Sequence, residues 1–96
     1  MKRPILFRRV TSPSMAPKLR PGQLIVAWSH WRKLKPGQVV ILRRNDKELV
    51  KRIERIEDDK VYVVGDNLPM STDSRHFGWL RQDEVVARVF RPNMAK

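Results

Sequence analysis

Apolar residues along this chain occur in short runs that a polar or turn-forming residue soon interrupts. In several runs apolar and polar side chains alternate, and Pro, Gly, Asn and Asp separate one run from the next. This rhythm is typical of β-strands joined by tight turns, and no stretch shows the 3.6-residue spacing of a sizeable helix. We therefore predict a mostly-β chain with six strands: Phe7–Thr11, Gln23–Trp28, Val39–Arg43, Lys47–Ile56, Lys60–Val64 and Val85–Phe90.

The segments between these runs carry specific turn signals. Asn45-Asp46 and Asp58-Asp59 predict hairpin turns, because Asn and Asp side chains hydrogen-bond to nearby backbone groups. Residues 18–26 and 33–41 resemble each other, and each contains Pro-Gly before an apolar run. Pro-Gly fits the central positions of a type II turn, where proline presets φ and glycine accepts a positive φ. One further short turn is expected at residues 30–35.

Length and composition restrict the class of protein. The 96 residues predict a single domain spanning 1–96, with no room for a second core. There is no cysteine, which excludes disulfides, thiolate metal sites and a cysteine nucleophile. The two histidines are too few for a histidine metal site without carboxylates beside them. The longest apolar run, residues 24–28, is far shorter than the about 20 residues that span a membrane.

The formal net charge of +11 bears on partners and location. A field of that sign favours acidic partners such as nucleic acid, anionic lipid or acidic protein segments. The basic pairs are scattered and no base-reading motif accompanies them, so we do not expect nucleic acid to be the main partner. We expect a cytoplasmic protein, with peripheral contact to an anionic membrane surface as a second expectation.

One lysine lies within a predicted strand, in Leu49-Val50-Lys51-Arg52-Ile53. Side chains alternate across a strand, so Lys51 shares a face with Leu49 and Ile53, and Arg52 lies on the more polar face. Desolvation on an inward face lowers the pKa of a lysine and allows it to act as a base near neutral pH. The alternative is a lysine whose stem covers the core while its amine reaches water. The strand alone favours that alternative.

Two polar loops, one before and one after this strand, supply hydroxyl groups. Together with Lys51 they contain the parts of a serine–lysine hydrolase. In order and spacing the three segments resemble the nucleophile box, the general-base box and the third box of the type I signal peptidases, over residues 12–78. The matching residues are Ser12-Pro13-Ser14-Met15 with Pro17, then Lys51-Arg52-Ile53, then Gly65-Asp66-Asn67, Ser71 and Asp73-Ser74-Arg75.

The resemblance implies catalytic roles for four of these residues. Ser14 Oγ is expected to attack a peptide carbonyl, with Lys51 as its general base. The Ser14 backbone N–H and the Ser12 hydroxyl are expected to form the oxyanion hole. Ser71 is expected to hydrogen-bond to the Lys51 amine and aim it at the nucleophile.

The same resemblance implies supporting roles around this dyad. Met15 and Pro17 are expected to contact the substrate beside the nucleophile. Asp73 and Arg75 are expected to pair and brace the loop that carries Ser71. The remaining residues with an expected structural role in that loop are Gly65, Asp66, Asn67 and Ser74. The chemistry needs no metal and no cofactor.

Within the family, the short separation of Lys51 from Gly65 leaves no room for the inserted second domain of large signal peptidases. The chain is closer to the nickel-type superoxide dismutase maturation proteases. The implied fold is a small, partly open β-barrel of the signal-peptidase and LexA type. The implied substrate is a protein whose N-terminal leader or signal peptide is removed, with the dismutase as the narrower expectation.

Two alternatives stay open. A LexA-like self-cleaving domain uses the same serine–lysine chemistry on a related fold. A DNA-binding module and a cleavable linker would be expected before it, whereas only eleven residues precede Ser12. A non-catalytic basic β-module would instead bind nucleic acid or anionic membrane through its aromatic side chains, namely Trp28, Trp31, Phe77 and Trp79.

Overall fold

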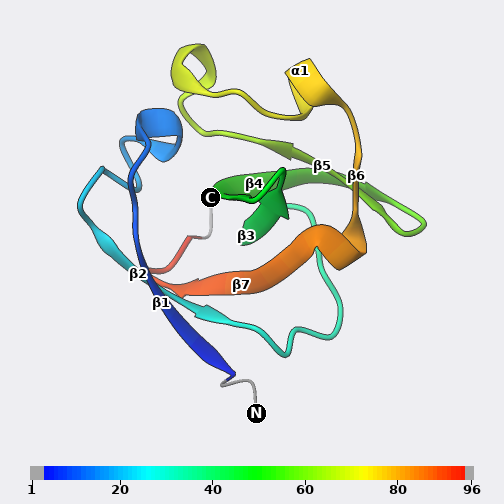
Figure 1. Ribbon diagram of the computed structural model, residues 1–96, viewed down its shortest axis with the longest axis horizontal. Coiled ribbons are helices and arrows are strands. Elements are labelled where there is room, and N and C mark those ends of the chain that lie inside the picture. Colours follow the sequence, from blue (N-terminus) through cyan, green and yellow to red (C-terminus); the bar gives the residue numbers. More distant parts are fainter. Residues whose placement is uncertain (1–3, 95–96) are drawn as a thin grey trace.

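A computed structural model describes residues 4–94, and they form one antiparallel sheet of seven strands (Figure 1). The order across the sheet is β1-β2-β7-β3-β4-β5-β6. The sheet curls but does not close, because its edge strands β1 and β6 each pair on one side only. The expected mostly-β, partly open, single-domain fold is confirmed. The strands are β1 (Ile5–Arg9), β2 (Leu24–Trp28), β3 (Val39–Arg44), β4 (Lys47–Glu57), β5 (Lys60–Val64), β6 (Leu80–Arg81) and β7 (Val85–Arg91).

Short helical turns connect the strands. They are the 3₁₀ turns η1 (Pro13–Met15), η2 (Leu68–Met70) and η3 (Gln82–Glu84), and the single α-helical turn α1 (Ser74–Phe77). The sequence pattern missed β6 and α1, because elements of two and four residues are too short for a periodicity to appear. The turns η1 and η2 contact each other at the top of Figure 1. This contact brings the two polar loops of the sequence together.

The turn signals are reproduced at four of the five expected places, including the β4–β5 hairpin at Asp58-Asp59, where Asp58 has a φ of 51°. Asn45 and Asp46 both have positive φ, 51° and 63°, as a tight β3–β4 hairpin requires. Gly22 and Gly37 follow their prolines with φ of 91° and 94°. The short turn expected at residues 30–35 is absent, and the chain there is an irregular connection. The first strand also ends at Arg9, two residues earlier than predicted, because the chain then leads into η1.

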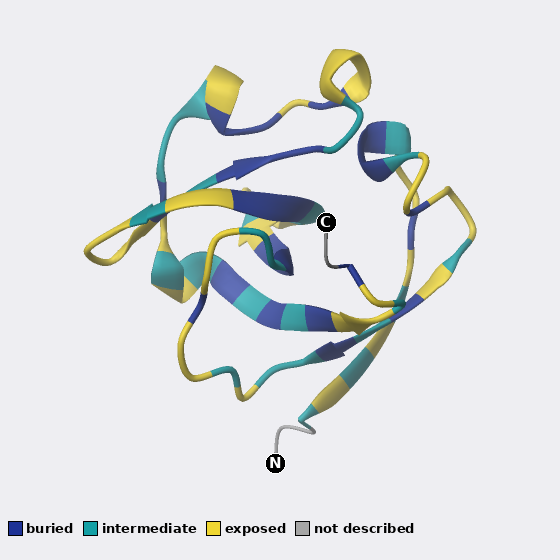
Figure 2. Cartoon of the chain, turned by 180° about the vertical axis from the view of Figure 1, so that it is seen from behind, coloured by how far each residue is buried: buried dark blue, intermediate teal, exposed yellow. Residues whose placement is uncertain are grey.

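Two hydrophobic clusters lie on opposite faces of the central strand β3. Its residues alternate between them: Val39 and Ile41 belong to one, Val40 and Leu42 to the other. A strand buried on both faces reads as a continuous apolar run, which explains the sequence of β3. Strand β7 instead alternates between buried and half-buried residues along most of its length (Figure 2).

The middle of β4 is buried on both faces as well. Lys51 is 3% exposed and Arg52 is 2% exposed. Lys51 is therefore buried on an inward face and is not the water-reaching lysine that the strand alone favoured. The prediction of a more polar face for Arg52 is wrong, because Arg52 is not on a solvent-facing side of the strand. The loop carrying Asp66 and the carbonyl groups of Gly37 and Met94 cover it and accept its hydrogen bonds.

Candidate active site

A pocket of about 250 Å³ lies between β1 and β4, which are not neighbours in the sheet. Residues 8–12, 14, 15 and 48–51 line it. Ser14 and Lys51 therefore face the same space although 37 positions separate them in the sequence. In the lining of this pocket Arg8 Nε donates to Glu48 Oε1 over 2.8 Å, which links the two strands by side chains. Both residues of the expected dyad thus line this pocket.

The serine loop is held in a defined shape by its own cap and by the second loop. Pro13 begins η1, where its lack of an N–H is harmless. The backbone N–H of Ser14 donates to Ser12 Oγ over 3.2 Å. The carbonyl oxygen of Ser14 accepts the Asn67 N–H over 2.8 Å, and Asn67 Nδ2 donates to the Pro13 carbonyl oxygen over 3.1 Å. Ser14 itself is buried, while Ser12 is exposed.

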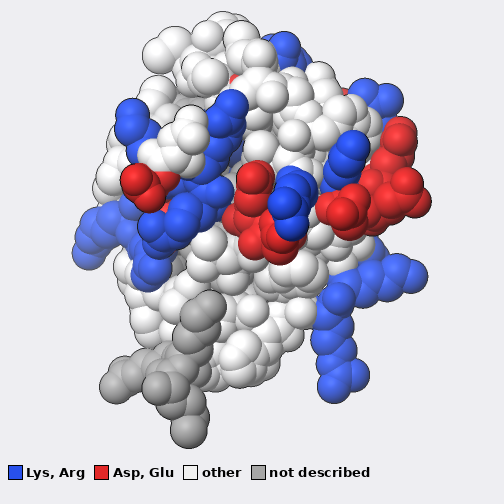
Figure 3. Space-filling model, turned by 45° about the vertical axis from the view of Figure 1, so that its right-hand side comes forward, with Lys and Arg blue, Asp and Glu red and all other residues white. Residues whose placement is uncertain are grey.

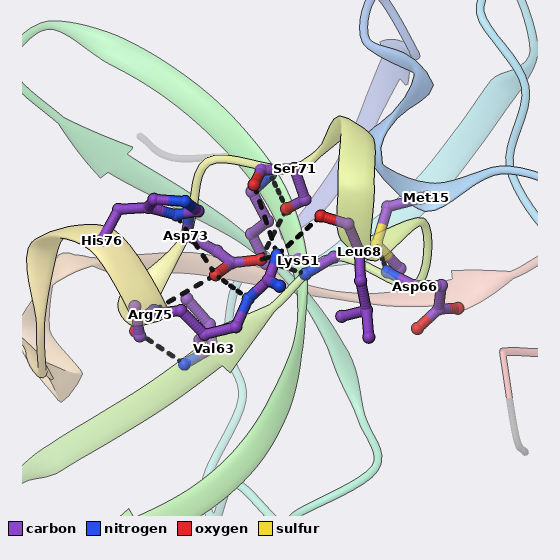
Figure 4. Close-up of polar contacts among 11 residues, drawn as sticks. Met15, Lys51, Val63, Asp66, Leu68, Ser71, Asp73, Arg75 and His76 are labelled. Carbon is purple, nitrogen blue, oxygen red and sulfur yellow. Dashed lines mark hydrogen bonds and ion pairs between the residues drawn. The ribbon is translucent and has the colours of Figure 1, made fainter.

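Lys51 ends a chain of hydrogen bonds that begins at a buried carboxylate (Figure 4). Lys51 Nζ donates to Ser71 Oγ over 3.0 Å, and the Ser71 hydroxyl donates to Asp73 Oδ2 over 2.6 Å. An ionised carboxylate can only accept, so the Ser71 proton points to Asp73 and a lone pair of Ser71 Oγ faces the amine. One N–H of Lys51 is thereby directed at Ser71. The lone pair of a neutral Lys51 is then directed away from Ser71.

Burial lowers the pKa of Lys51, because desolvation disfavours the charged ammonium. The negative charge of Asp73 raises this pKa, and the positive charge of Arg75 adds to the lowering. The net result is an amine that loses its proton at a lower pH than an exposed lysine does.

Asp73 is fully buried and remains ionised because of its hydrogen bonds. Burial opposes its ionisation, but hydrogen bonds from Arg75, Ser71 and the Gly65 backbone outweigh that effect and hold the pKa of Asp73 below its ordinary value. Arg75 Nε donates over 2.9 Å and the Gly65 N–H over 2.8 Å. The carboxylate is therefore an ionised acceptor at neutral pH. It fixes the Ser71 hydroxyl on one side and the turn at Gly65 on the other.

Gly65 marks the closest approach of the two loops. A Cβ atom at this position would lie 2.2 Å from Ser71 Oγ and 2.6 Å from the Ser14 carbonyl oxygen. Neither distance is tolerated by real side chains, so only glycine lets these loops pack together here. The need for glycine follows from the spacing of the loops, not from an unusual φ.

The residue after the lysine holds the same loop from behind. Arg52 and Asp66 form two parallel hydrogen bonds, Nε to Oδ1 and Nη2 to Oδ2, each 2.8 Å long. Such a bidentate pair fixes the orientation of both groups. Arg52 Nη1 also donates to the carbonyl oxygens of Gly37 and Met94. Sequence reasoning assigned Asp66 to the turn and missed this partner, because no local signal links positions 14 residues apart.

The remaining expected residues are placed as follows. Met15 lies at the pocket wall but is almost wholly buried in the core, where its Sδ accepts the Asp66 N–H over 3.4 Å. Pro17 is exposed and does not line the pocket. Ser74 is buried, and its Oγ accepts the Val63 N–H over 2.8 Å, which ties α1 to β5.

His76 has a structural role that the sequence analysis did not assign. Its Nδ1 accepts the Asp73 backbone N–H over 3.3 Å, which completes a capping box at α1. The Asp-x-x-His spacing at 73–76 was the signal that could have revealed it. Between residues 4 and 94, no group of three or more His, Cys, Asp or Glu side chains is arranged to hold a metal ion.

None of the helical turns in the described part of the chain has the length and apolar character that crossing a membrane requires. A comparison with curated protein sequences finds no match. A comparison with protein-family models does find one, over residues 2–90, which is nearly the whole chain. The chain belongs to the Peptidase S24-like family.

Proposed function

We propose that this chain is a serine peptidase in which Ser14 is the nucleophile and Lys51 is the general base. Two observations support the proposal: membership of a peptidase family, and a desolvated lysine that faces the same pocket as a buried serine. The single observation that carries it is the buried hydrogen-bond chain from Asp73 through Ser71 to Lys51. It holds an amine of lowered pKa at the pocket that also contains Ser14.

The proposed reaction has two stages that balance within these residues. Neutral Lys51 takes the proton of the Ser14 hydroxyl as Oγ bonds to the substrate carbonyl carbon. Lys51 then delivers that proton to the departing amine, which leaves an acyl group on Ser14. A water molecule, deprotonated by Lys51, hydrolyses the ester and restores both residues.

The oxyanion is proposed to bind where the Ser14 N–H and the Ser12 hydroxyl can both reach it. In the unliganded chain the Ser14 N–H donates to Ser12 Oγ over 3.2 Å, a long bond between a buried donor and an exposed side chain. An incoming carbonyl oxygen would replace Ser12 as the acceptor, and rotation of Ser12 would then turn its hydroxyl into a second donor. Donors that meet charge only in the transition state lower the barrier.

An extended peptide is the substrate shape that fits this pocket. Within residues 4–94, β1 pairs with β2 only, and β5 pairs with β4 no earlier than Arg52, so residues 47–51 of β4 have a free backbone edge. Both free edges flank the pocket. A peptide can hydrogen-bond along such edges as an added strand. On the resemblance to the signal peptidases we propose removal of an N-terminal leader, with nickel-type superoxide dismutase as the narrower candidate substrate.

The test is cleavage of a mixed library of unstructured peptides by the purified chain, with products identified by mass spectrometry. We expect new cleavage products with the wild type and none with Ser14→Ala or Lys51→Arg, because a guanidinium cannot deprotonate at neutral pH. Thr72→Ala is the control, since Thr72 is exposed on the same loop as Ser71. Cleavage by Lys51→Arg at the wild-type rate contradicts the proposal.

A second candidate is self-cleavage of the LexA type, which membership of the S24-like family favours. The two candidates differ in what is cut. Incubation of the chain alone at raised pH, followed by intact-mass measurement, would reveal a concentration-independent loss of full-length chain if self-cleavage is the function. We expect no such loss at times when library peptides are already cleaved.

A further inference from the structure

The outward face of β1, β2 and β7 carries exposed apolar side chains that the peptidase chemistry does not use. Opposite residues of antiparallel strands share a face. Ile5 lies opposite Trp28 and Phe7 opposite Val26, and Phe90 lines one hollow together with Trp28. Phe7 is 60% exposed, and Ile5 and Phe90 are exposed as well. We call this set, with Leu24 at its end, the outer apolar face.

The strands that carry the outer apolar face contain only basic charged residues. All ten Asp and Glu residues lie between Asp46 and Glu84, so the chain segments that form β1, β2 and β7 contain none of them. Arg9, Arg88 and Arg91 stand on these strands instead. In the view of Figure 3, acidic side chains gather in clusters beside Lys and Arg. The excess of positive charge therefore lies outside residues 46–84, in the segments that include β1, β2 and β7.

A basic and aromatic hollow continues this face. It has a volume of about 610 Å³ and is lined by the connection after β2 together with Arg88 of β7. Trp28 and His30 stack edge to face there with ring centroids 5.8 Å apart. The other basic residues of the lining are Arg32, Lys33 and Lys35. Trp28 and Arg88 line both this hollow and the one beside Phe90, so the two surfaces are continuous.

We propose that the outer apolar face and its basic hollow bind the surface of an anionic lipid bilayer. Aromatic and aliphatic side chains bordered by Arg and Lys are the composition of interfacial membrane-binding surfaces. Anionic headgroups attract such clusters of basic residues. The apolar part consists of Ile, Leu, Val and Phe as well as Trp, and the aliphatic members offer nothing for a nucleic-acid base to stack on. Complementary charge and apolar character together select lipid over RNA.

Docking in this way would place the candidate active site close to the membrane. β1 runs from the outer apolar face directly into the turn that carries Ser14. Arg9 lies opposite Leu24 of that face and also lines the pocket of Ser14 and Lys51. Peptides that lie on an anionic membrane would then meet the pocket from the lipid side. The inference does not depend on the proposed peptidase activity, because vesicle binding is measured without a substrate.

The first test is co-sedimentation with phosphatidylcholine vesicles made with and without phosphatidylglycerol. We expect the wild type to sediment with the anionic vesicles only, and more weakly as salt is added. Phe7→Ser should weaken this binding by about tenfold or more, since a buried Phe contributes strongly to transfer out of water. Met70→Ser is the matched control, because Met70 is 59% exposed on η2, away from this face. It should bind as the wild type does, and circular dichroism checks that both variants are folded.

The second test removes charge without touching the apolar residues. Lys33→Gln with Lys35→Gln should weaken binding to the anionic vesicles several-fold. Lys47→Gln with Lys60→Gln removes the same charge from exposed positions in the acid-containing segment and should have little effect.

Four outcomes would overturn the proposal. They are no binding to anionic vesicles, equal loss in the two lysine pairs, equal loss in Phe7→Ser and Met70→Ser, and tighter binding to a single-stranded oligonucleotide than to vesicles. Sedimentation velocity adds a further check: a dimer that Phe7→Ser dissociates would assign the face to self-association instead.

Discussion

At the scale of single residues, the protonation of Lys51 decides what the pocket can do. Burial disfavours the charged ammonium form of Lys51, and so does the positive charge of Arg75. The negative charge of Asp73 favours the ammonium form. Ser71 stands between Lys51 and Asp73 and accepts from one while donating to the other. The carboxylate thus orients the lysine through a neutral hydroxyl and makes no direct hydrogen bond to it. A direct ion pair would stabilise the ammonium more strongly and suppress its basicity.

The pH dependence of cleavage follows from this arrangement. Lys51 must be neutral to accept the Ser14 proton, and its pKa is lowered by burial. We expect kcat/KM to rise with pH and to level off at a pH below about 10.4, which is the pKa of a free lysine. The measurement is a pH–rate profile on a peptide found by library cleavage. A rate that does not change between about pH 6 and pH 9 would argue against a lysine base.

The same lowered pKa makes a prediction about folding stability. Between the lowered folded-state pKa of Lys51 and its unfolded value, the unfolded chain binds more protons, so stability rises with pH across that window. Lys51→Met removes this dependence. We expect the free energy of unfolding of Lys51→Met to exceed that of the wild type by the largest amount at the acidic end of the window. The difference should shrink as pH rises.

Denaturant unfolding of both chains across this range measures the difference. Lys47→Met is the control, because Lys47 is exposed on the same strand. A stability gain that is independent of pH would mean that Lys51 titrates as an ordinary lysine.

At the scale of elements, two loops are locked together over a strand. η1 and η2 belong to segments more than fifty residues apart, yet Asn67 and Gly65 fix the serine loop to the loop of Ser71. The motifs identified which residues would gather here. They did not reveal how, because the Gly65 approach and the Arg52–Asp66 pair depend on how the sheet curls. Alternation placed Lys51 among aliphatic side chains, whereas the burial of Arg52 required knowing what covers the other face.

Gly65→Ala should be more harmful than a surface glycine change. Its Cβ would collide with Ser71 Oγ and the Ser14 carbonyl oxygen, so one loop has to move. We expect a loss of about 1–3 kcal/mol in stability, typical of overpacking, and a large loss of activity. Thr72→Ala, at an exposed position of the same loop, should leave both nearly unchanged. An active, fully stable Gly65→Ala chain would show that the loops do not need this contact.

Arg52→Met tests the clamp behind the loop. It leaves Asp66 without its bidentate partner, and breaking a largely buried pair typically costs about 3–5 kcal/mol. Adding Asp66→Asn should restore part of that loss, because a largely buried charge that has lost its bidentate partner is removed. Unfolding free energies of the two single variants and the double variant form the cycle. Additive losses would mean that the two side chains do not act as a pair.

At the scale of the whole molecule, side chains link two strands that the open sheet does not pair. Strands β1 and β4 face each other across the pocket without backbone pairing, and the Arg8–Glu48 ion pair spans the gap. Strand positions, turn types and the mostly-β class were predictable because they depend on local patterns. The order of strands across the sheet was not, since β7 pairs between β2 and β3 from the far end of the chain.

The net charge of +11 also acts on the molecule as a whole. Like charges repel within a compact chain, and salt screens that repulsion over about 8 Å at physiological ionic strength. We expect the melting temperature to rise when salt is added from a low level. Thermal unfolding followed by circular dichroism measures it. A steady fall with added salt would mean that the few ion pairs outweigh the excess positive charge.

The most direct test of the Ser14–Lys51 chemistry is capture of the covalent intermediate. A slowly hydrolysed peptide ester is mixed with the chain, the reaction is quenched with acid, and the digested protein is examined by mass spectrometry. A serine–lysine mechanism predicts an acyl group on the fragment that contains Ser14 in the wild type, and none with Lys51→Met. Acylation of another residue, or acylation of Ser14 at the wild-type rate without Lys51, would contradict it.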